Sequence, residues 1–119
     1  MKVAVIGSRN ATADAARLIL KHLPADVTEI VSGGAHGIDA LAEDVAKSLS
    51  LPVKIFLPDY KTFGRQAPLF RNRQIIDYAD RVLAFWDGHS PGTRSVIGIC
   101  LEIGKPLQIV NLNQNETED

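Results

Sequence analysis

The stretch EIVSGGAHGIDALAEDVAKSL, residues 29–49, decides the fold class of this chain. Residues 29–31, Glu-Ile-Val, have the pattern of a short strand, and a glycine-rich loop follows them at once. After the loop, apolar residues recur at the spacing of one helix face, at Ile38, Leu41, Ala42, Val45, Ala46 and Leu49. The stretch therefore predicts a strand, a tight turn and a helix, which is the repeating unit of α/β proteins with a parallel sheet.

The same alternation continues on both sides of this stretch. Short apolar runs predict further strands at residues 3–6, 53–57, 81–86 and 107–110. Helices are predicted at residues 12–23, 68–79 and 93–103, with Pro24 and Gly104 as stop signals, and a loop at 59–66. Five strands that alternate with helices predict a single Rossmann-like, doubly wound parallel sheet in the order 3-2-1-4-5.

The composition is that of one globular domain. The chain has 119 residues, of which 45% are hydrophobic and 23% charged. These values exclude a disordered chain, and the length leaves no room for a separate substrate domain. We expect the Rossmann-like domain to span residues 1–110 and a polar, disordered tail to span residues 111–119.

Charge and cysteine content exclude several function classes. The net charge of -1 argues against a global basic field, although without Glu116, Glu118 and Asp119 the body carries 13 basic and 11 acidic residues. Cys100 is the one cysteine, so no disulfide or cysteine-pair metal site is expected, and its apolar helix predicts an inert, buried thiol. The chain shows neither a signal peptide nor a membrane-spanning run, which predicts a cytoplasmic protein without a membrane partner.

Candidate site residues follow from the predicted sheet. Ligands bind outside the carboxyl ends of the strands in such sheets, and three strands end here in glycine-containing loops, at residues 7–9, 32–37 and 88–93. Two of the loops open into helices, whose first N–H groups attract anions that glycine lets approach closely. We therefore predict a phosphate-bearing ligand held by Gly7, Ser8, Arg9, Ser32, Gly33, Gly34, His36, Gly37, Asp39, Arg71, Asn72, Trp86, Ser90, Gly92 and Thr93. The structural alternative is that glycine is common in any strand–helix turn.

Individual residues have open alternatives. Asp39 could orient its loop by capping N–H groups, which we favour, or accept ribose hydroxyls. Trp86 could wall a base pocket or belong to the core. His36 and His89 could contact a ligand or be ordinary loop residues, whereas His22 near a helix end is predicted to be structural.

Two common nucleotide motifs are absent from the sequence. The adjacent glycines Gly33 and Gly34 follow the second strand, so they do not form the G-x-G-x-x-G fingerprint that follows the first strand of dinucleotide-binding proteins. No Gly-Lys-Ser or Gly-Lys-Thr follows a glycine loop, so there is no Walker A sequence. An ordinary NAD dehydrogenase and a P-loop nucleotidase are therefore disfavoured.

A basic and aromatic segment lies between residues 60 and 76. It contains no carboxylate and carries Tyr60, Lys61, Phe63, Arg65, Phe70, Arg71 and Arg73. Cations interleaved with aromatics suit a phosphate together with a stacked base. The alternative is a solvated loop whose aromatics fold onto the core, and both interpretations stay open.

Considered together, several motifs resemble the SLOG superfamily, and in particular its small stand-alone bacterial and phage members of the YspA type. These motifs are VSGGAHGID at residues 31–39, Arg71-Asn72, Ala79-Asp80, Trp86-Asp87-Gly88 and Ser90-Pro91-Gly92-Thr93. The resemblance extends to Val110. The superfamily includes DNA-processing protein A, the LONELY GUY phosphoribohydrolases and sensor domains. The resemblance implies a nucleotide pocket over the glycine loops and a ligand related to NAD, ADP-ribose or another nucleotide.

Three functions follow from the resemblance. The first is the binding or sensing of a nucleotide-derived ligand, without a further cofactor. The second is N-glycosidic hydrolysis, as in LONELY GUY proteins, but the glutamate two residues after the threonine of their motif is Ser95 here. Asp39 and Asp87 are then the candidate catalytic acids. The third is single-stranded DNA binding, as in DNA-processing protein A. We expect a binding module, with homodimer formation as a further expectation, rather than an enzyme.

Overall fold

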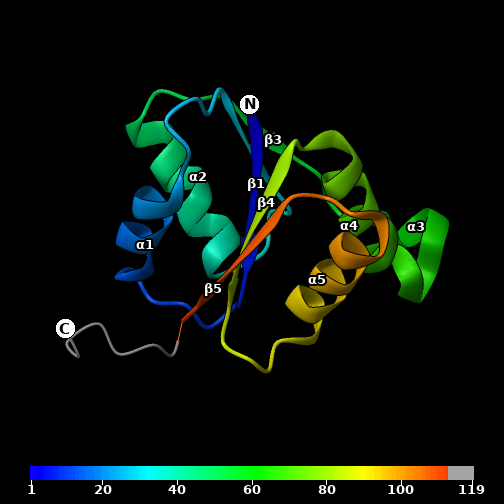
Figure 1. Ribbon diagram of the computed structural model, residues 1–119. Helices are drawn as coiled ribbons and strands as arrows, with labels where there is room; N and C mark the ends of the chain where they lie inside the picture. Colours follow the sequence, from blue (N-terminus) through cyan, green and yellow to red (C-terminus); the bar gives the residue numbers. More distant parts are fainter. Residues whose placement is uncertain (113–119) are drawn as a thin grey trace.

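The computed structural model describes residues 1–112 as an α/β fold built on one sheet (Figure 1). The five strands are β1 (Lys2–Gly7), β2 (Glu29–Ser32), β3 (Val53–Ile55), β4 (Arg81–Trp86) and β5 (Leu107–Asn111). Every neighbouring pair is parallel, and the order is β3-β2-β1-β4-β5. The predicted fold class and strand order are confirmed.

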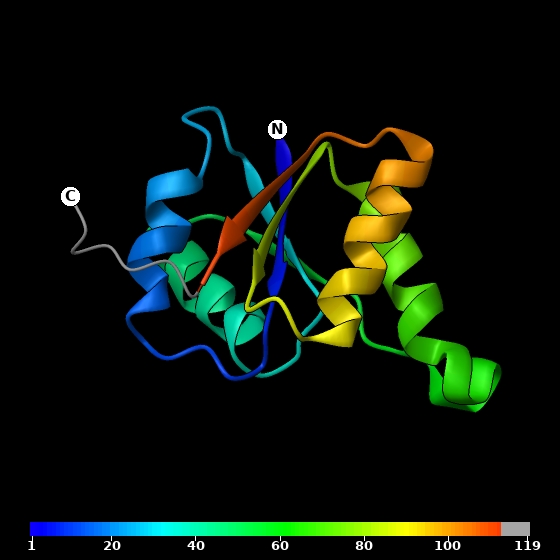
Figure 2. The ribbon, with the colours of Figure 1, turned by 60° about the horizontal axis from the view of Figure 1, so that its bottom comes forward.

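Two pairs of helices cover the two faces of the sheet (Figures 1 and 2). Helices α1 (Ala15–His22) and α2 (Ile38–Ser48) lie on one face, and α4 (Ala67–Tyr78) and α5 (Pro91–Ile103) lie on the other. Strand β1 is buried on both sides, because Val3 and Val5 pack with α1 and α2 while Ala4 packs with α4 and α5. All strands run in one direction, so their carboxyl ends meet at one edge.

The prediction of a loop at residues 59–66 is wrong. This segment contains the short helix α3 (Tyr60–Phe63) and a 3-10 turn, η1 (Gly64–Gln66). Asp59 caps α3 by accepting a 3.1 Å hydrogen bond from the Thr62 N–H. A four-residue helix has no room for the apolar repeat that predicts longer helices, so the pattern did not reveal it.

Several element ends differ from the prediction. Helix α1 begins at Ala15 rather than residue 12, because the preceding residues form turns in which the Ala15 N–H donates to the Thr12 carbonyl oxygen. Strand β5 includes Asn111, which was expected to begin the tail. Leu112 of the predicted tail forms a turn, and residues 113–119 lie outside the described residues.

The remaining expectations concern residues away from the sheet edge. Cys100 is buried among the α5 core residues, and burial raises the pKa of its thiol, as expected for an inert cysteine. His22 donates from its Nδ1 to the Leu18 carbonyl oxygen at 2.8 Å and packs edge-on against Phe85, in agreement with a structural role. Within residues 1–112, no helix has the length and apolar character needed to cross a membrane.

Candidate nucleotide-binding site

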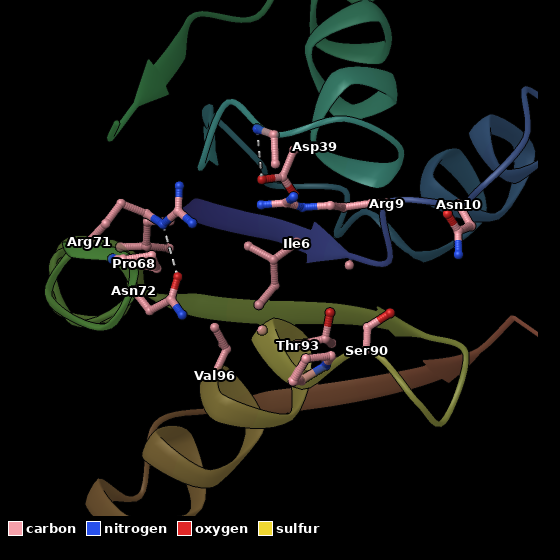
Figure 3. Close-up of a pocket in the computed structure, with 15 residues that line it drawn as sticks. Ile6, Arg9, Asn10, Asp39, Pro68, Arg71, Asn72, Ser90, Thr93 and Val96 are labelled. Carbon is pink, nitrogen blue, oxygen red and sulfur yellow. Dashed lines mark hydrogen bonds between the residues drawn. The ribbon is translucent and has the colours of Figure 1, made fainter. Parts of the chain in front are cut away.

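A pocket of about 500 Å³ lies at the carboxyl edge of the sheet, between the α2 side and the α4–α5 side (Figure 3). Residues from four segments line it: the end of β1, the start of α2, α4 and the first turns of α5. Of the predicted site residues, the pocket brings together Gly7, Arg9, Asp39, Arg71, Asn72, Ser90, Gly92 and Thr93. Ser8, Ser32, Gly33, Gly34, His36, Gly37 and Trp86 do not line it.

Arg71 is held in place by two hydrogen bonds. Its Nη1 donates to the carbonyl oxygen of Gly33 at 2.7 Å, and its Nε donates to Oδ1 of Asn72 at 2.9 Å. Burial lowers the pKa of Arg71, the charges of Asp39 and Tyr60 raise it, and the nearby charge of Arg9 lowers it. The guanidinium is thus already oriented at the pocket wall, close enough to a second guanidinium for the two to repel each other.

Among residues 1–112, Asp39 is the one carboxylate that lines this pocket. It is buried, and its Oδ2 accepts a 3.3 Å hydrogen bond from the Ala35 N–H. Burial raises the pKa of Asp39, against the opposing effects of the Ala35 hydrogen bond and the Arg71 charge. The hydrogen bond agrees with the favoured interpretation that Asp39 orients the loop before α2.

Charge and helix geometry together suit an anion in the pocket. Arg9 and Arg71 carry two positive charges there against the single carboxylate of Asp39. Helix α5 begins at Pro91, and its first intrahelical bond runs from the Arg94 N–H to the Ser90 carbonyl oxygen. The N–H groups of Gly92 and Thr93 therefore lack intrahelical partners and carry the positive end of the helix dipole.

The space around Gly92 is open. A Cβ atom built on Gly92 would meet no atom within 4 Å, so a ligand can approach its backbone.

Asn72 lies across the pocket from this turn, and Figure 3 shows its amide group pointing into the pocket. The pocket thus offers backbone N–H groups, two guanidiniums and an amide, a donor-rich set that matches phosphate oxygens.

The glycines before α2 serve close packing. A Cβ atom on Gly33 would lie 2.8 Å from Oδ2 of Asp39 and 2.9 Å from Nη1 of Arg71. Gly37 has a φ of 74° and packs against the backbone of Ser8 and Arg9. The Ile38 N–H at the start of α2 donates to the Ser8 carbonyl oxygen at 3.1 Å. These contacts account for the glycines through protein packing, and phosphate contact by Gly33, Gly34 and Gly37 stays a prediction.

The loop from β4 to α5 is held by its own hydrogen bonds. Asp87 Oδ1 accepts from the N–H groups of His89 and Ser90, at 2.8 Å each. These bonds lower the pKa of Asp87 to about 2. The buried Ser8 Oγ accepts from the Asp87 N–H at 3.1 Å, and Trp86 Nε1 donates to the Ser90 carbonyl oxygen at 3.1 Å. Ser8, Trp86 and Asp87 thus shape the turn that presents α5.

A second pocket, of about 520 Å³, lies on the α1 side of the same edge. Asp87 and His89 line it together with Ser8 and residues at the start of α1. The two candidate catalytic acids, Asp39 and Asp87, therefore line different pockets. Asn10 lines both pockets, but it belongs to no motif, and only its position next to Arg9 distinguishes it in the sequence.

The basic segment is divided by the fold. Of its four cations, Arg71 lines the pocket, whereas Lys61, Arg65 and Arg73 are exposed outside it. The pocket also has apolar walls from Ile6, Pro68, Ile75 and Val96, none of which was predicted as a site residue. These residues belong to ordinary apolar helix and strand patterns, which carry no signal of a ligand.

Comparisons with known proteins agree with this architecture. A family model described as DNA recombination-mediator protein A matches residues 1–58. A solved structure of DNA processing protein A from Helicobacter pylori, determined for its single-stranded DNA binding mode, is similar with a TM-score of 0.69 and 25% identity. That match covers 97% of this chain and 68% of the other. A search of curated proteins found no match.

Proposed function

We propose that this chain, a small SLOG-type protein similar to DNA-processing protein A, binds single-stranded DNA at the pocket between α2, α4 and α5. In this proposal one phosphate-bearing nucleotide unit enters the pocket. Its phosphate is held by Arg9, Arg71 and the first turn of α5, and its base or sugar contacts Asn72 and the apolar wall.

The convergence of Arg9 and Arg71 on one pocket carries the proposal. Two like charges close together destabilise each other, and an anion between them removes that repulsion. Asp39 compensates one of the charges and is held by the Ala35 N–H, which leaves one positive charge for a ligand. A phosphodiester carries one negative charge, so it matches the pocket without leaving an unpaired buried charge.

The form of the ligand is inferred from the similar structure. DNA processing protein A from Helicobacter pylori binds single-stranded DNA, and its match to this chain extends over nearly all of the fold. The modest charge of the body, 13 basic against 11 acidic residues, does not oppose this inference, because binding here uses a local site. We therefore place single-stranded DNA before free nucleotides.

A free nucleotide-derived ligand, such as ADP-ribose, is the second candidate. A pocket of about 500 Å³ is within the range of small-molecule sites, and the phosphate chemistry is the same. N-glycosidic hydrolysis has less support. Asp39 and Asp87 line different pockets, and a carboxyl group with a pKa of about 2 is ionised at neutral pH, so Asp87 is a poor general acid.

Fluorescence anisotropy with labelled oligothymidine tests the proposal. The Arg9→Ala variant should weaken binding about tenfold and lower the salt dependence by about 0.7 in the slope of log K against log salt, as expected for one lost phosphate contact. Arg17→Ala removes an exposed arginine from α1 and serves as the matched control. Equal effects of the two substitutions would contradict the proposed site.

Calorimetry with ADP-ribose, NAD and nucleoside monophosphates distinguishes the two ligand forms. Binding of oligothymidine without heat from the free nucleotides supports single-stranded DNA. Tight binding of a free nucleotide with no oligothymidine binding would replace the proposal by the second candidate. Homodimer formation stays a prediction, which light scattering with and without oligothymidine can test.

A further inference from the structure

A corner of the molecule outside the pocket exposes aromatic rings beside cations. We call it the α3–α4 corner and define it by the rings of Tyr60, Phe63 and Phe70 and the cations Lys61, Arg65 and Arg73. Figure 2 shows α3 projecting beyond the end of α4, away from the sheet. Within residues 1–112, none of these six residues lines either of the two pockets described above.

Two of the three rings, those of Phe63 and Phe70, are stacked on each other and remain open to solvent. The centroids of Phe63 and Phe70 lie 4.1 Å apart with an interplanar angle of 20°. Both side chains are 39% exposed, and Tyr60 is 58% exposed. Of the two interpretations left open by the sequence, folding of these aromatics onto the core is therefore wrong. Contiguous apolar surface of this kind marks a binding site more often than scattered single residues do.

The positive charge around the rings favours an anionic partner. Residues 60–76 contain four cations and no carboxylate. One carboxylate adjoins each end of this segment: Asp59, which caps α3 by accepting from the Thr62 N–H, and Asp77, four positions after Arg73 on α4. Arg73 follows Phe70 by three positions on α4, so the two side chains share one helix face. An apolar stack within a purely cationic segment suits a polyanion that has flat rings.

The corner adjoins the pocket through α4, which contributes residues to both. Tyr60 is close enough to Arg71 to raise the pKa of that arginine, and Pro68 of α4 lines the pocket one turn before Arg71. Pro68, Phe70 and Arg71 thus lie on the same helix, and a strand bound at Arg71 can extend along α4 toward the corner.

We propose that the α3–α4 corner is a base-stacking platform that continues the single-stranded DNA site beyond the pocket. The exposed rings of Tyr60, Phe63 and Phe70 stack on successive bases, and Lys61, Arg65 and Arg73 contact the phosphates between them. The proposal rests on the proposed function, because it extends the same strand. It commits to single-stranded DNA as the occupant, rather than to a protein partner or a second copy of the chain.

The test measures how the bases and the phosphates of a DNA strand contribute to binding, separately at the pocket and at the α3–α4 corner. The probes are an oligothymidine of about 12 nucleotides, an abasic strand of the same length, and a 5′-phosphorylated thymidine dinucleotide that fills the pocket alone. The double variant Phe63→Leu/Phe70→Leu keeps apolar side chains at exposed positions and removes the aromatic faces. Leu101→Ala, at an exposed position on α5, is the control.

We expect the wild-type protein to bind the long thymidine strand at least about tenfold more tightly than the abasic strand. The double variant should lose this difference and bind both long strands alike, while its affinity for the dinucleotide and its melting temperature stay unchanged. The Leu101→Ala protein should behave as the wild type. This pattern assigns the loss to base stacking at the corner.

Three outcomes would overturn the platform. The double variant could bind the long thymidine strand as the wild type does. The wild type could fail to distinguish thymidine from abasic strands. The double variant could instead change the oligomeric state of the ligand-free protein, which would make the corner a surface between protein chains. A failure of the proposed pocket site can be distinguished from these outcomes. In that case Arg9→Ala would leave the affinity for the dinucleotide unchanged.

Discussion

Arg71 donates a 2.7 Å hydrogen bond from its Nη1 to the carbonyl oxygen of Gly33, which lies 38 positions earlier in the chain. The bond joins α4, on one face of the sheet, to the loop that leads into α2 on the other face. It leaves no space for a side chain at position 33, because a Cβ atom there would meet both Arg71 and Asp39. The orientation of the main pocket cation thus depends on a glycine that does not line the pocket.

Gly33→Ala should therefore displace Arg71 and Asp39. The added Cβ would lie 2.8 Å from Oδ2 of Asp39, so both side chains must move. We expect the variant to lose about 1–3 kcal/mol of unfolding free energy, as for other overpacked positions, and to bind oligothymidine at least about tenfold more weakly. Urea unfolding and fluorescence anisotropy measure the two effects.

Gly98→Ala is the matched control for this substitution. A Cβ atom on Gly98 in α5 would meet no atom within 4 Å, and alanine favours helix over glycine by about 0.5–1 kcal/mol. The control should therefore be slightly stabilised and bind normally. If Gly33→Ala were as stable and as active as Gly98→Ala, the packing role of Gly33 would be refuted.

Asp39→Asn should strengthen the binding of an anion at neutral pH. The substitution removes the one carboxylate of the pocket and keeps an oxygen for the Ala35 N–H. One unit charge near a protein surface is worth about 1 kcal/mol or more, which corresponds to an affinity gain of about fivefold. Hydrolysis that used Asp39 would instead be abolished, so chromatography for a released base separates the two functions.

The stability of the Asp39→Asn variant should depend on pH in a defined direction. Burial raises the pKa of Asp39 in the folded state, so its contribution to stability is complete below the unfolded pKa of about 3.9 and declines as pH rises through the raised pKa. The variant should therefore gain stability relative to the wild type between about pH 4 and pH 7. Thermal melting at several pH values measures the difference, and a constant difference would contradict the raised pKa.

Asp87→Asn should show the opposite dependence on pH. The pKa of Asp87 is lowered to about 2 by the N–H groups of His89 and Ser90, so its contribution is present above the unfolded pKa and is lost as pH falls through about 2. The wild type should be more stable than the variant at neutral pH, and the difference should close between about pH 4 and pH 2. Asp44→Asn, an exposed carboxylate on α2, is the control in the same melting experiment. An unchanged difference down to about pH 2 would refute the role of this charge.

Ser8→Ala should destabilise the loop that presents α5. The hydroxyl of Ser8 is buried, accepts the Asp87 N–H at 3.1 Å and lies 3.0 Å from the Ser90 hydroxyl. The substitution removes these hydrogen bonds, and a typical intramolecular hydrogen bond contributes about 0.5–1.5 kcal/mol, which urea unfolding can measure. Ser95→Ala on α5 is the control, and an equal, small effect of both substitutions would contradict the buried network.

Much of the fold was predictable because its signals are local. Alternating apolar runs and helix-spaced stripes in residues 29–49 and their neighbours predicted five parallel strands in the observed order. Helix α3 was not predictable in this way, because four residues are too short for a periodic pattern and Asp59 caps them through one side chain. The α1 start was misplaced for a related reason, since turns at its beginning resemble helix in composition.

The candidate site was only partly predictable. Glycine at a strand end predicts a tight approach of the backbone, but the approaching group can be a ligand or another part of the chain. At Gly33 and Gly37 that group is protein, namely Asp39 and Arg71 in one case and the Ser8–Arg9 backbone in the other. At Gly92 the space is open and belongs to the pocket.

Residue order was therefore sufficient to specify the parallel sheet, the edge at which its loops meet and the kind of side chain gathered there, because each depends on local patterns and on strand direction. Packing in three dimensions alone established that Arg9, Arg71 and Asp39 line one pocket, that Asp39 and Asp87 line separate pockets, and that Phe63 stacks on Phe70 in the open. These relationships join segments far apart in the chain, and no local pattern encodes the distance between them.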